Sequence, residues 1–141
     1  MVFQRQAVEA RLKELDRILQ ELAKYRDLAP ERFETDLGLR WVIERGLIAA
    51  AAVVFDVADH ILVGQYGVYA DTYGESLAAL RDQGVISAGL YDQLRGLGGL
   101  RNILVHRYLD IDPRQVADHA RKGMDVFPRF GQEIMDWMDK P

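Results

Sequence analysis

The sequence contains no cysteine, and proline is scarce, with four residues. Disulfides and thiolate metal sites are therefore excluded, and the composition suits a reducing compartment. Hydrophobic residues make up 49% of the chain and charged residues 28%, which is ordinary for a globular domain and excludes extended disorder. At 141 residues the chain is long enough for one core, so we expect a single helical domain over residues 1–141.

The chain also lacks the long apolar runs of secreted and membrane-spanning proteins. Its first twelve residues carry Arg5, Glu9 and Arg11, where a signal peptide needs an unbroken apolar stretch. The longest apolar run, 47–55, is much shorter than the ~18 residues that indicate a membrane-spanning helix. We therefore expect a cytoplasmic protein with no membrane partner.

Excess positive charge is absent too, because the net charge is −4. This argues against general nucleic-acid binding, which depends on neutralising many phosphates. The charge is unevenly distributed, however. Residues 95–122 hold six basic and three acidic side chains, whereas the rest of the chain is strongly acidic. Either the clustering is chance, or an anionic ligand is drawn to this segment.

Helical periodicity dominates the first half of the chain. Apolar residues recur every three or four positions over 3–28, which predicts an amphipathic helix. Pro30 fits the first turn of a second helix over 31–63, whose middle is apolar on all sides. A helix that is apolar all round must be covered all round, so we expect it at the centre of a bundle or in a dimer interface.

Turn and capping residues divide the second half. Residues 64–71 read as a loop, and Thr72 with Glu75 fits a capping box for a third helix that Gly84 ends. Ser87 suits the start of a fourth helix over 88–108, and Asp112 with the proline after it suits the start of a fifth helix to about residue 138. No segment alternates as a strand does. We predict an all-α, up-and-down bundle of four to five helices.

Polar residues interrupt the apolar pattern of 98–112, which reads G-G-L-R-N-I-L-V-H-R-Y-L-D-I-D. Arg101 offers a planar charged fork for phosphate, and His106 has the side chain whose ordinary pKa lies nearest neutrality. Together they can cleave RNA without metal, because His106 can move a proton while Arg101 stabilises phosphate charge. Asn102 can orient His106 or contact the sugar, and Tyr108 can stack on a base. The alternative is a polar patch near a helix end.

Helical geometry constrains this set. At about 100° per residue, Arg101 and Tyr108 lie within about 20° of each other, whereas Arg101 and His106 lie about 140° apart. One regular helix would not aim both Arg101 and His106 at one atom. Either the helix loosens near His106, or the site combines residues from two copies of the chain. Gly98 and Gly99 permit close backbone approach, and a two-fold dimer would bring two motifs together.

The arrangement Arg101-Asn102, His106 and Tyr108, preceded by Gly98-Gly99, resembles the HEPN superfamily and most closely its HepT-like RNase toxins. Segments 55–60 and 72–77 resemble the second and third helices of that family. The resemblance implies a HEPN-like helical domain that forms a homodimer. Arg107 departs from the pattern, because an acidic residue is commoner there; a second arginine can strengthen phosphate binding.

The resemblance also implies a function. It makes Arg101 and His106 the catalytic residues of a metal-independent endoribonuclease acting on tRNA or mRNA, the toxin of a type VII-like toxin–antitoxin system. The implied partner is a nucleotidyltransferase antitoxin of the MntA type, which can silence the toxin by transferring AMP to Tyr108. The alternative is a noncatalytic HEPN module that binds a nucleotide or the nucleotidyltransferase. A purely structural dimer would leave the polar residues unexplained.

Other candidates are secondary. Asp56, Asp59 and His60 lie within one helical turn of each other and either line the same cleft or serve as structural hydrogen-bonding residues. The three histidines lack the spacing of metal ligands, so we expect no metal site and no cofactor.

Overall fold

A computed structural model describes residues 2–141, and within this range the regular structure is entirely helical. The elements are α1 (Arg5–Ala23), α2 (Pro30–Thr35), α3 (Leu37–Ile61), the π-helical turn η1 (Leu62–Tyr66), α4 (Tyr73–Asp82), α5 (Ala88–Leu94), α6 (Leu97–His106), the 3-10 turn η2 (Tyr108–Asp110) and α7 (Pro113–Met138). The all-α class is confirmed. The prediction of four to five helices is too low, because two expected helices are each broken in two.

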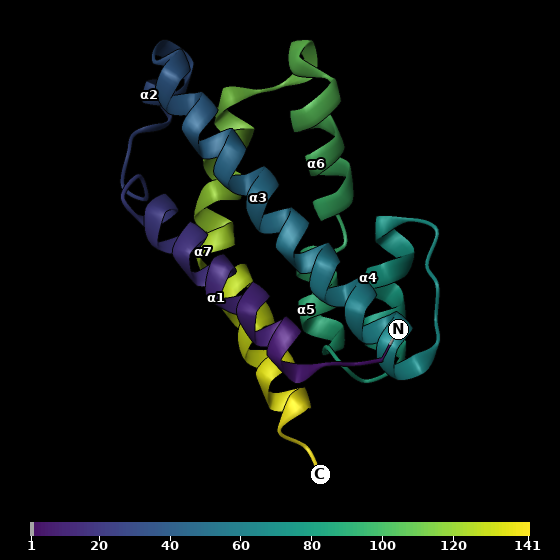
Figure 1. Cartoon of the computed structure of the whole chain (residues 1–141). Coiled ribbons are helices and arrows are strands. Elements are labelled where there is room, and N and C mark those ends of the chain that lie inside the picture. Colours follow the sequence, from purple (N-terminus) through teal and green to yellow (C-terminus); the bar gives the residue numbers. More distant parts are fainter. Residues whose placement is uncertain (1) are drawn as a thin grey trace.

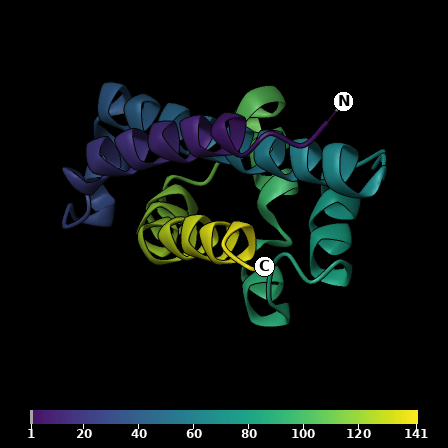
Figure 2. The same cartoon turned by 60° about the horizontal axis from the view of Figure 1, so that its bottom comes forward.

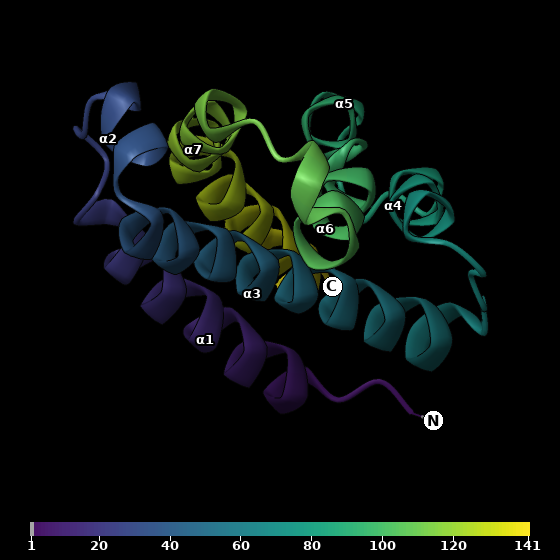
Figure 3. The same ribbon diagram turned by 90° about the horizontal axis from the view of Figure 1, so that it is seen from above.

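The long helix α3 lies at the centre of the bundle. It packs against α1, α4, α6 and α7, and Figure 3 shows α1 on one side of α3 with α4, α6 and the start of α7 on the other. Eleven of its side chains are buried, including Leu47, Val54 and Ile61. In Figure 2 the teal and green helices α4–α6 lie together, mainly to the right of α7 (yellow). The prediction that the apolar stretch 47–55 is central is therefore confirmed.

The expected helix over 31–63 is interrupted at Asp36. This residue is extended (φ −117°, ψ 93°), and its Oδ1 atom accepts a hydrogen bond of 3.0 Å from the Leu39 N–H. Aspartate is a favoured N-cap, so α3 starts afresh there while buried Phe33 anchors the short helix α2. At its other end α3 continues through η1 into the segment expected to be a loop, and stops at Gly67 (φ 65°).

Length and composition alone would let residues 37–66 cross a membrane, and no other helix among the described residues meets that test. However, 56% of its most apolar window is buried inside the protein. The packing of α1, α6 and α7 on α3 explains the apolar sequence, because these neighbours cover it on several sides.

The expected helix over 88–108 is divided as well. Helix α5 begins at Ser87, whose Oγ accepts from the Leu90 N–H at 3.1 Å, and it ends before Arg95 and Gly96. Helix α6 then begins in a glycine-rich stretch that weakens continuous helix. It stops after His106, because Arg107 leaves the helical region (φ −125°, ψ 55°). Tyr108 therefore lies outside the helix, and the predicted alignment with Arg101 on one helix face is wrong.

The other predicted helix starts are present. Thr72 Oγ1 accepts from the Glu75 N–H at 3.1 Å, although the Glu75 carboxylate reaches back to the Asp71 N–H instead of that of Thr72. Asp112 Oδ1 accepts from the Arg114 N–H at 3.0 Å, and α7 then runs through Pro128 to Met138. The Thr72 and Asp112 caps set the first residues of α4 and α7. Helices α5 and α6, with the motif, lie between these two elements in the chain.

Candidate functional site

Helix α6 carries both residues of the proposed catalytic pair. Arg101 is half-buried in its middle, and His106 is exposed as its last residue. Because the helix stays regular through His106, the pair remains about 140° apart around its axis. Within residues 2–141 no hydrogen bond joins the two side chains. The helix does not loosen before His106, so the first of the two explanations for a working pair is wrong.

Arg101 is held on the inner side of α6. Its Nη1 atom donates a long hydrogen bond of 3.4 Å to Asn102 Oδ1, and its guanidinium carbon lies 5.5 Å from the centre of the Tyr73 ring. Tyr73 in turn stacks on Phe55 of α3, with ring centres 4.2 Å apart and an interplanar angle of 27°. Asn102 thus contacts the arginine, and no contact with His106 is present among the described side chains.

The segment after α6 is a short, exposed turn. Arg107 Nε pairs with Asp110 Oδ2 at 2.8 Å, and the Asp110 N–H donates to the Arg107 carbonyl at 2.8 Å. The Tyr108 ring between them is 75% exposed. The structure therefore leaves the Tyr108 hydroxyl accessible two residues from His106, while the charge of Arg107 is partly neutralised by its neighbour.

A cleft of about 700 Å³ opens where α4, α6 and the end of α3 meet. Its walls include the polar side chains of Asp59, Asp71, Tyr73, Arg95 and Asn102. The cleft is thus lined both by the motif residue Asn102 and by Tyr73, whose ring contacts Arg101. A space of this size can accept a nucleotide of a larger RNA.

The three secondary candidates on α3 have different environments. Asp56 and Asp59 are both exposed, but only Asp59 lies in the wall of the cleft, and neither Asp56 nor His60 lines it. His60 Nε2 accepts a hydrogen bond of 3.1 Å from the Gln4 N–H, and its ring centre lies 5.7 Å from that of Phe3. His60 therefore fastens the N-terminal segment to the end of α3.

Burial raises the pKa of Asp59. The Ser76 hydroxyl donates to its Oδ1 atom at 3.3 Å and lowers the pKa, and the charge of Asp56 raises it again. A pKa above the unfolded value means that the folded protein binds this proton more tightly. The contribution of Asp59 to stability is therefore greatest below the ordinary pKa of 3.8 and is lost as the pH rises through the folded pKa.

We expect Asp59→Asn to raise the thermal unfolding midpoint at pH 7 and to flatten its decline above pH 3.8. Asparagine removes the partly desolvated charge but can still accept from Ser76. The matched control is Asp92→Asn, an exposed aspartate on α5, which should follow the parent curve. A lower midpoint for Asp59→Asn at neutral pH, with the parent's pH dependence, would show that the carboxylate stabilises the fold.

Two residues of the site lie outside the sequence motif. Tyr73 contacts Arg101 although it lies on α4, and Arg95 contributes a cation to the cleft from the end of α5. The excess of basic residues over 95–122 was a signal for Arg95. Tyr73 lies in segment 72–77, which resembles the third helix of the family, but nothing in the sequence marked its contact with Arg101, because contact across helices depends on which faces meet.

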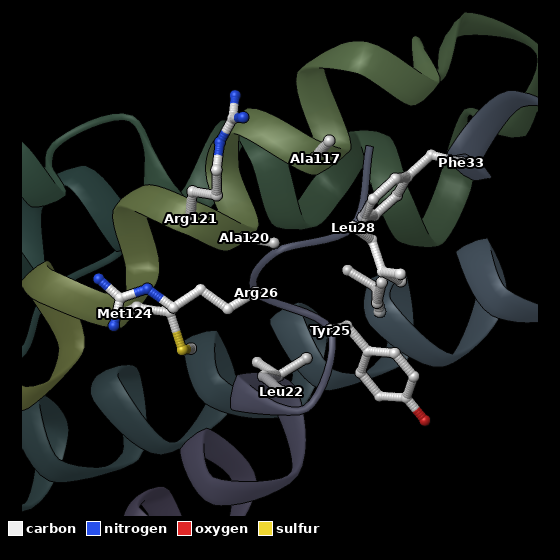
Figure 4. A pocket seen from close by; sticks show the side chains of 10 residues that line it. Leu22, Tyr25, Arg26, Leu28, Phe33, Ala117, Ala120, Arg121 and Met124 are labelled. Carbon is white, nitrogen blue, oxygen red and sulfur yellow. The ribbon is translucent and has the colours of Figure 1, made fainter. Parts of the chain in front are cut away.

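The protein has other cavities besides the cleft. A groove of about 480 Å³ between α5–α6 and α7 has mainly apolar walls, with His119 and Lys122 among its polar residues. Burial lowers the pKa of His119, which favours the neutral imidazole there. The pocket in Figure 4, where the end of α1 meets α2 and α7, holds only about 10 Å³, the space of roughly one water. Within residues 2–141 no three acidic, His or Cys side chains gather as metal ligands.

Comparison with known proteins identifies the family. The family model described as "Ribonuclease HepT-like" matches residues 15–134. The tRNA nuclease HepT of Aphanizomenon flos-aquae is 28% identical over 131 residues, which cover 93% of this chain and 89% of that protein.

Solved structures agree with this result at the level of the fold. The tri-AMPylated HEPN toxin of Shewanella oneidensis, in complex with its MNT antitoxin, superposes with a TM-score of 0.85 at 21% identity, covering 94% of this chain and 99% of that one. A toxin–antitoxin structure with AMP-PNP gives a TM-score of 0.83 at 21% identity, covering 93% and 99%. The motif, the HEPN fold and the matched family model together show that the chain belongs to the HepT-like ribonuclease family.

Proposed function

We propose that this chain is the toxin of a type VII-like toxin–antitoxin pair and acts in the cytoplasm as a metal-independent endoribonuclease. The observation that carries the proposal is the position of Arg101 and His106 on α6, the helix whose Asn102 lines a nucleotide-sized cleft, in a chain of the HepT-like ribonuclease family. Transfer RNA is the preferred substrate class, because the relative from Aphanizomenon flos-aquae is a tRNA nuclease.

The proposed reaction is an in-line displacement at phosphorus. Neutral His106 takes the proton of a ribose 2′-hydroxyl, and the 2′-oxygen forms a bond to the adjacent phosphorus while the bond to the 5′-oxygen breaks. An imidazolium, the His106 of a second copy, gives its proton to that leaving oxygen. Arg101 binds the phosphate and stabilises the charge that develops on its oxygens. The products are a 2′,3′-cyclic phosphate and a 5′-hydroxyl.

A homodimer would complete this site. Within residues 2–141, eight large hydrophobic side chains are exposed, and six of them lie on α3 or around the end of α6: Leu37, Trp41, Val42, Val105, Tyr108 and Leu109. The start of α3 and the end of α6 lie toward the same end of the molecule (Figure 1). A two-fold contact through these residues would cover them and bring two copies of α6 together.

We propose that the antitoxin is a nucleotidyltransferase of the MntA type that modifies Tyr108. Its exposed phenol oxygen would attack the α-phosphorus of ATP, forming a Tyr–AMP bond and releasing pyrophosphate, while the phenol proton passes to the transferase. The added AMP brings bulk and negative charge within two residues of His106. It would crowd His106 and repel an RNA phosphate.

Arg95 supplies a second phosphate contact in this proposal, because it lines the same cleft as Asn102 and has no salt-bridge partner within residues 2–141. We expect Arg95→Ala to weaken RNA binding and to reduce the slope of log affinity against log salt by about 0.7, the value for one phosphate on a single strand. Filter binding at several salt concentrations measures both quantities. Arg17→Ala, an exposed arginine on α1, is the control and should retain the parent slope. An unchanged slope for Arg95→Ala would remove Arg95 from the RNA contact.

Induced expression in cells tests the function as a whole. We expect growth arrest that Arg101→Ala relieves, that co-expression of the neighbouring nucleotidyltransferase frame prevents, and that coincides with loss of intact tRNA. Mass analysis of the co-expressed toxin should then show AMP on Tyr108. RNA binding without any cleavage, by parent protein free of contaminating nuclease, would instead favour a noncatalytic HEPN module that binds a nucleotide or the nucleotidyltransferase.

A further inference from the structure

We infer that Tyr73 is a positioning residue for Arg101, held in place because Gly98 has no side chain. The inference rests on the proposed function, since it assigns Tyr73 a role in the same site. It concerns a contact between two helices: Tyr73 is the first residue of α4, whereas Arg101 and Gly98 belong to α6.

The Tyr73 ring contacts two other side chains, Phe55 and Arg101. Phe55, which is 4% exposed in the core, supports the Tyr73 ring at 4.2 Å between centres. The Arg101 guanidinium lies over the Tyr73 ring at 5.5 Å, within the range of about 6 Å for attraction between a cation and an aromatic face. The core therefore fixes the tyrosine, and the tyrosine limits where the arginine can lie.

Gly98 makes this stack possible. A Cβ atom at position 98 would lie 2.6 Å from Tyr73 Cβ and 3.1 Å from its Cδ2 atom. Both Cβ atoms would be attached directly to backbone, so neither could move without separating α4 from α6. At the neighbouring Gly99 a Cβ atom would meet nothing within 4 Å. The glycine requirement is thus specific to position 98, and it concerns the contact with Tyr73.

A fixed arginine matters because an unrestrained one has many rotamers. The free energy of holding a phosphate in a reactive position is smaller when the group that binds it is already placed. The only hydrogen bond of the Arg101 guanidinium within residues 2–141 is the long one to Asn102 at 3.4 Å. The stack on Tyr73 is therefore the principal restraint on its orientation.

A double-mutant cycle tests this role. The background is His106→Ala, which we expect to bind RNA while cutting it far more slowly. In it we expect Tyr73→Leu to weaken RNA affinity about tenfold and Tyr73→Phe to change it less than about twofold. When Arg101→Ala is also present, Tyr73→Leu should have no further effect beyond about twofold. Tyr73→Met, which keeps most of the volume but no aromatic face, repeats the test if the leucine variant unfolds.

The rate of RNA cleavage provides a second test of the role of Tyr73. Gly98→Ala should lower kcat by about ten- to a hundredfold, as expected when a catalytic group is displaced by about 1 Å. It should also lower the unfolding temperature, because α4 and α6 must separate, so cleavage is measured at a temperature where the variant is folded. Gly131→Ala is the control, because a Cβ atom at this position on α7 would also meet nothing within 4 Å, and it should cleave like the parent. Equal losses from Tyr73→Leu with and without Arg101 would overturn the inference, because Tyr73 would then contact RNA itself. So would equal activities for the two alanine variants. If Arg101→Ala itself cleaves like the parent, the proposed function fails instead.

Discussion

Replacing His106 with alanine is expected to lower the rate of RNA cleavage by roughly 10²- to 10⁴-fold, the contribution of a positioned general acid or base. The imidazole is exposed at the end of α6, so its removal costs little packing, and the variant should unfold at the parent temperature. RNA affinity should change little, because Arg101 and Arg95 are proposed to make the phosphate contacts. Cleavage of end-labelled tRNA under single-turnover conditions measures the effect.

The matched control for this experiment is His119→Ala. His119 lies on α7 and faces the groove between α7 and α5–α6. Its replacement should leave the cleavage rate within about twofold of the parent, although some stability is lost with a half-buried side chain. If His106→Ala and His119→Ala cleave at the same rate, His106 has no part in the chemistry.

Replacing Trp41 with glutamate is expected to separate the proposed dimer and to remove cleavage with it. The Trp41 side chain is 60% exposed on α3, so a charge there should not disturb the monomer. In a two-fold contact each substitution is made twice, and burying two unpaired carboxylates would weaken association by at least about a hundredfold. Sedimentation at micromolar concentration should show a monomer, and cleavage should fall at least about tenfold.

Val2→Glu is the control for Trp41→Glu. Val2 is 76% exposed, and its backbone lies against Gly64 in η1, beyond the opposite end of α3 from Trp41. This variant should sediment and cleave as the parent does. A Trp41→Glu protein that is monomeric and fully active would show that one chain contains the whole site. One that remains dimeric would place the interface elsewhere.

The sequence was most informative about the all-α fold class and about the N-cap residues of the helices. Apolar spacing predicted helices throughout and placed the stretch 47–55 in the core, and both predictions are confirmed. Thr72, Ser87 and Asp112 were recognisable as N-caps because their side chains accept hydrogen bonds from the first turn of a helix. These are local effects, and local sequence is enough to reveal them.

The breaks within long periodic segments were harder to predict. At Asp36 a capping side chain interrupts an otherwise continuous pattern, and the periodicity resumes after it almost unchanged. The sequence did not show that the helix breaks at Gly96, because Gly98 and Gly99 close by lie within α6 without breaking it. The end of α6 after His106 moved Tyr108 off the helix, so its supposed alignment with Arg101 failed. Whether a helix ends at a residue of low helix propensity depends on the tertiary packing of its neighbours, which local sequence does not show.

The motif identified the candidate catalytic residues but not Tyr73 or the steric role of Gly98. Arg101 and His106 were predicted about 140° apart on α6, and the helix is regular enough for that separation to hold. The contact between Tyr73 and Arg101 joins residues on different helices, and the clash that excludes a side chain at Gly98 arises only when α4 and α6 meet. Contacts of this kind require the three-dimensional structure.

The most direct measurement is the chemical identity of the RNA ends produced by purified parent protein in the presence of a metal chelator. Attack by a ribose 2′-hydroxyl, with His106 moving the protons and Arg101 stabilising the phosphate, yields 2′,3′-cyclic phosphate and 5′-hydroxyl ends. We expect these ends from the parent and not from Arg101→Ala purified in parallel. Ends carrying a 5′-phosphate, or cleavage that stops when metal is removed, would contradict this mechanism.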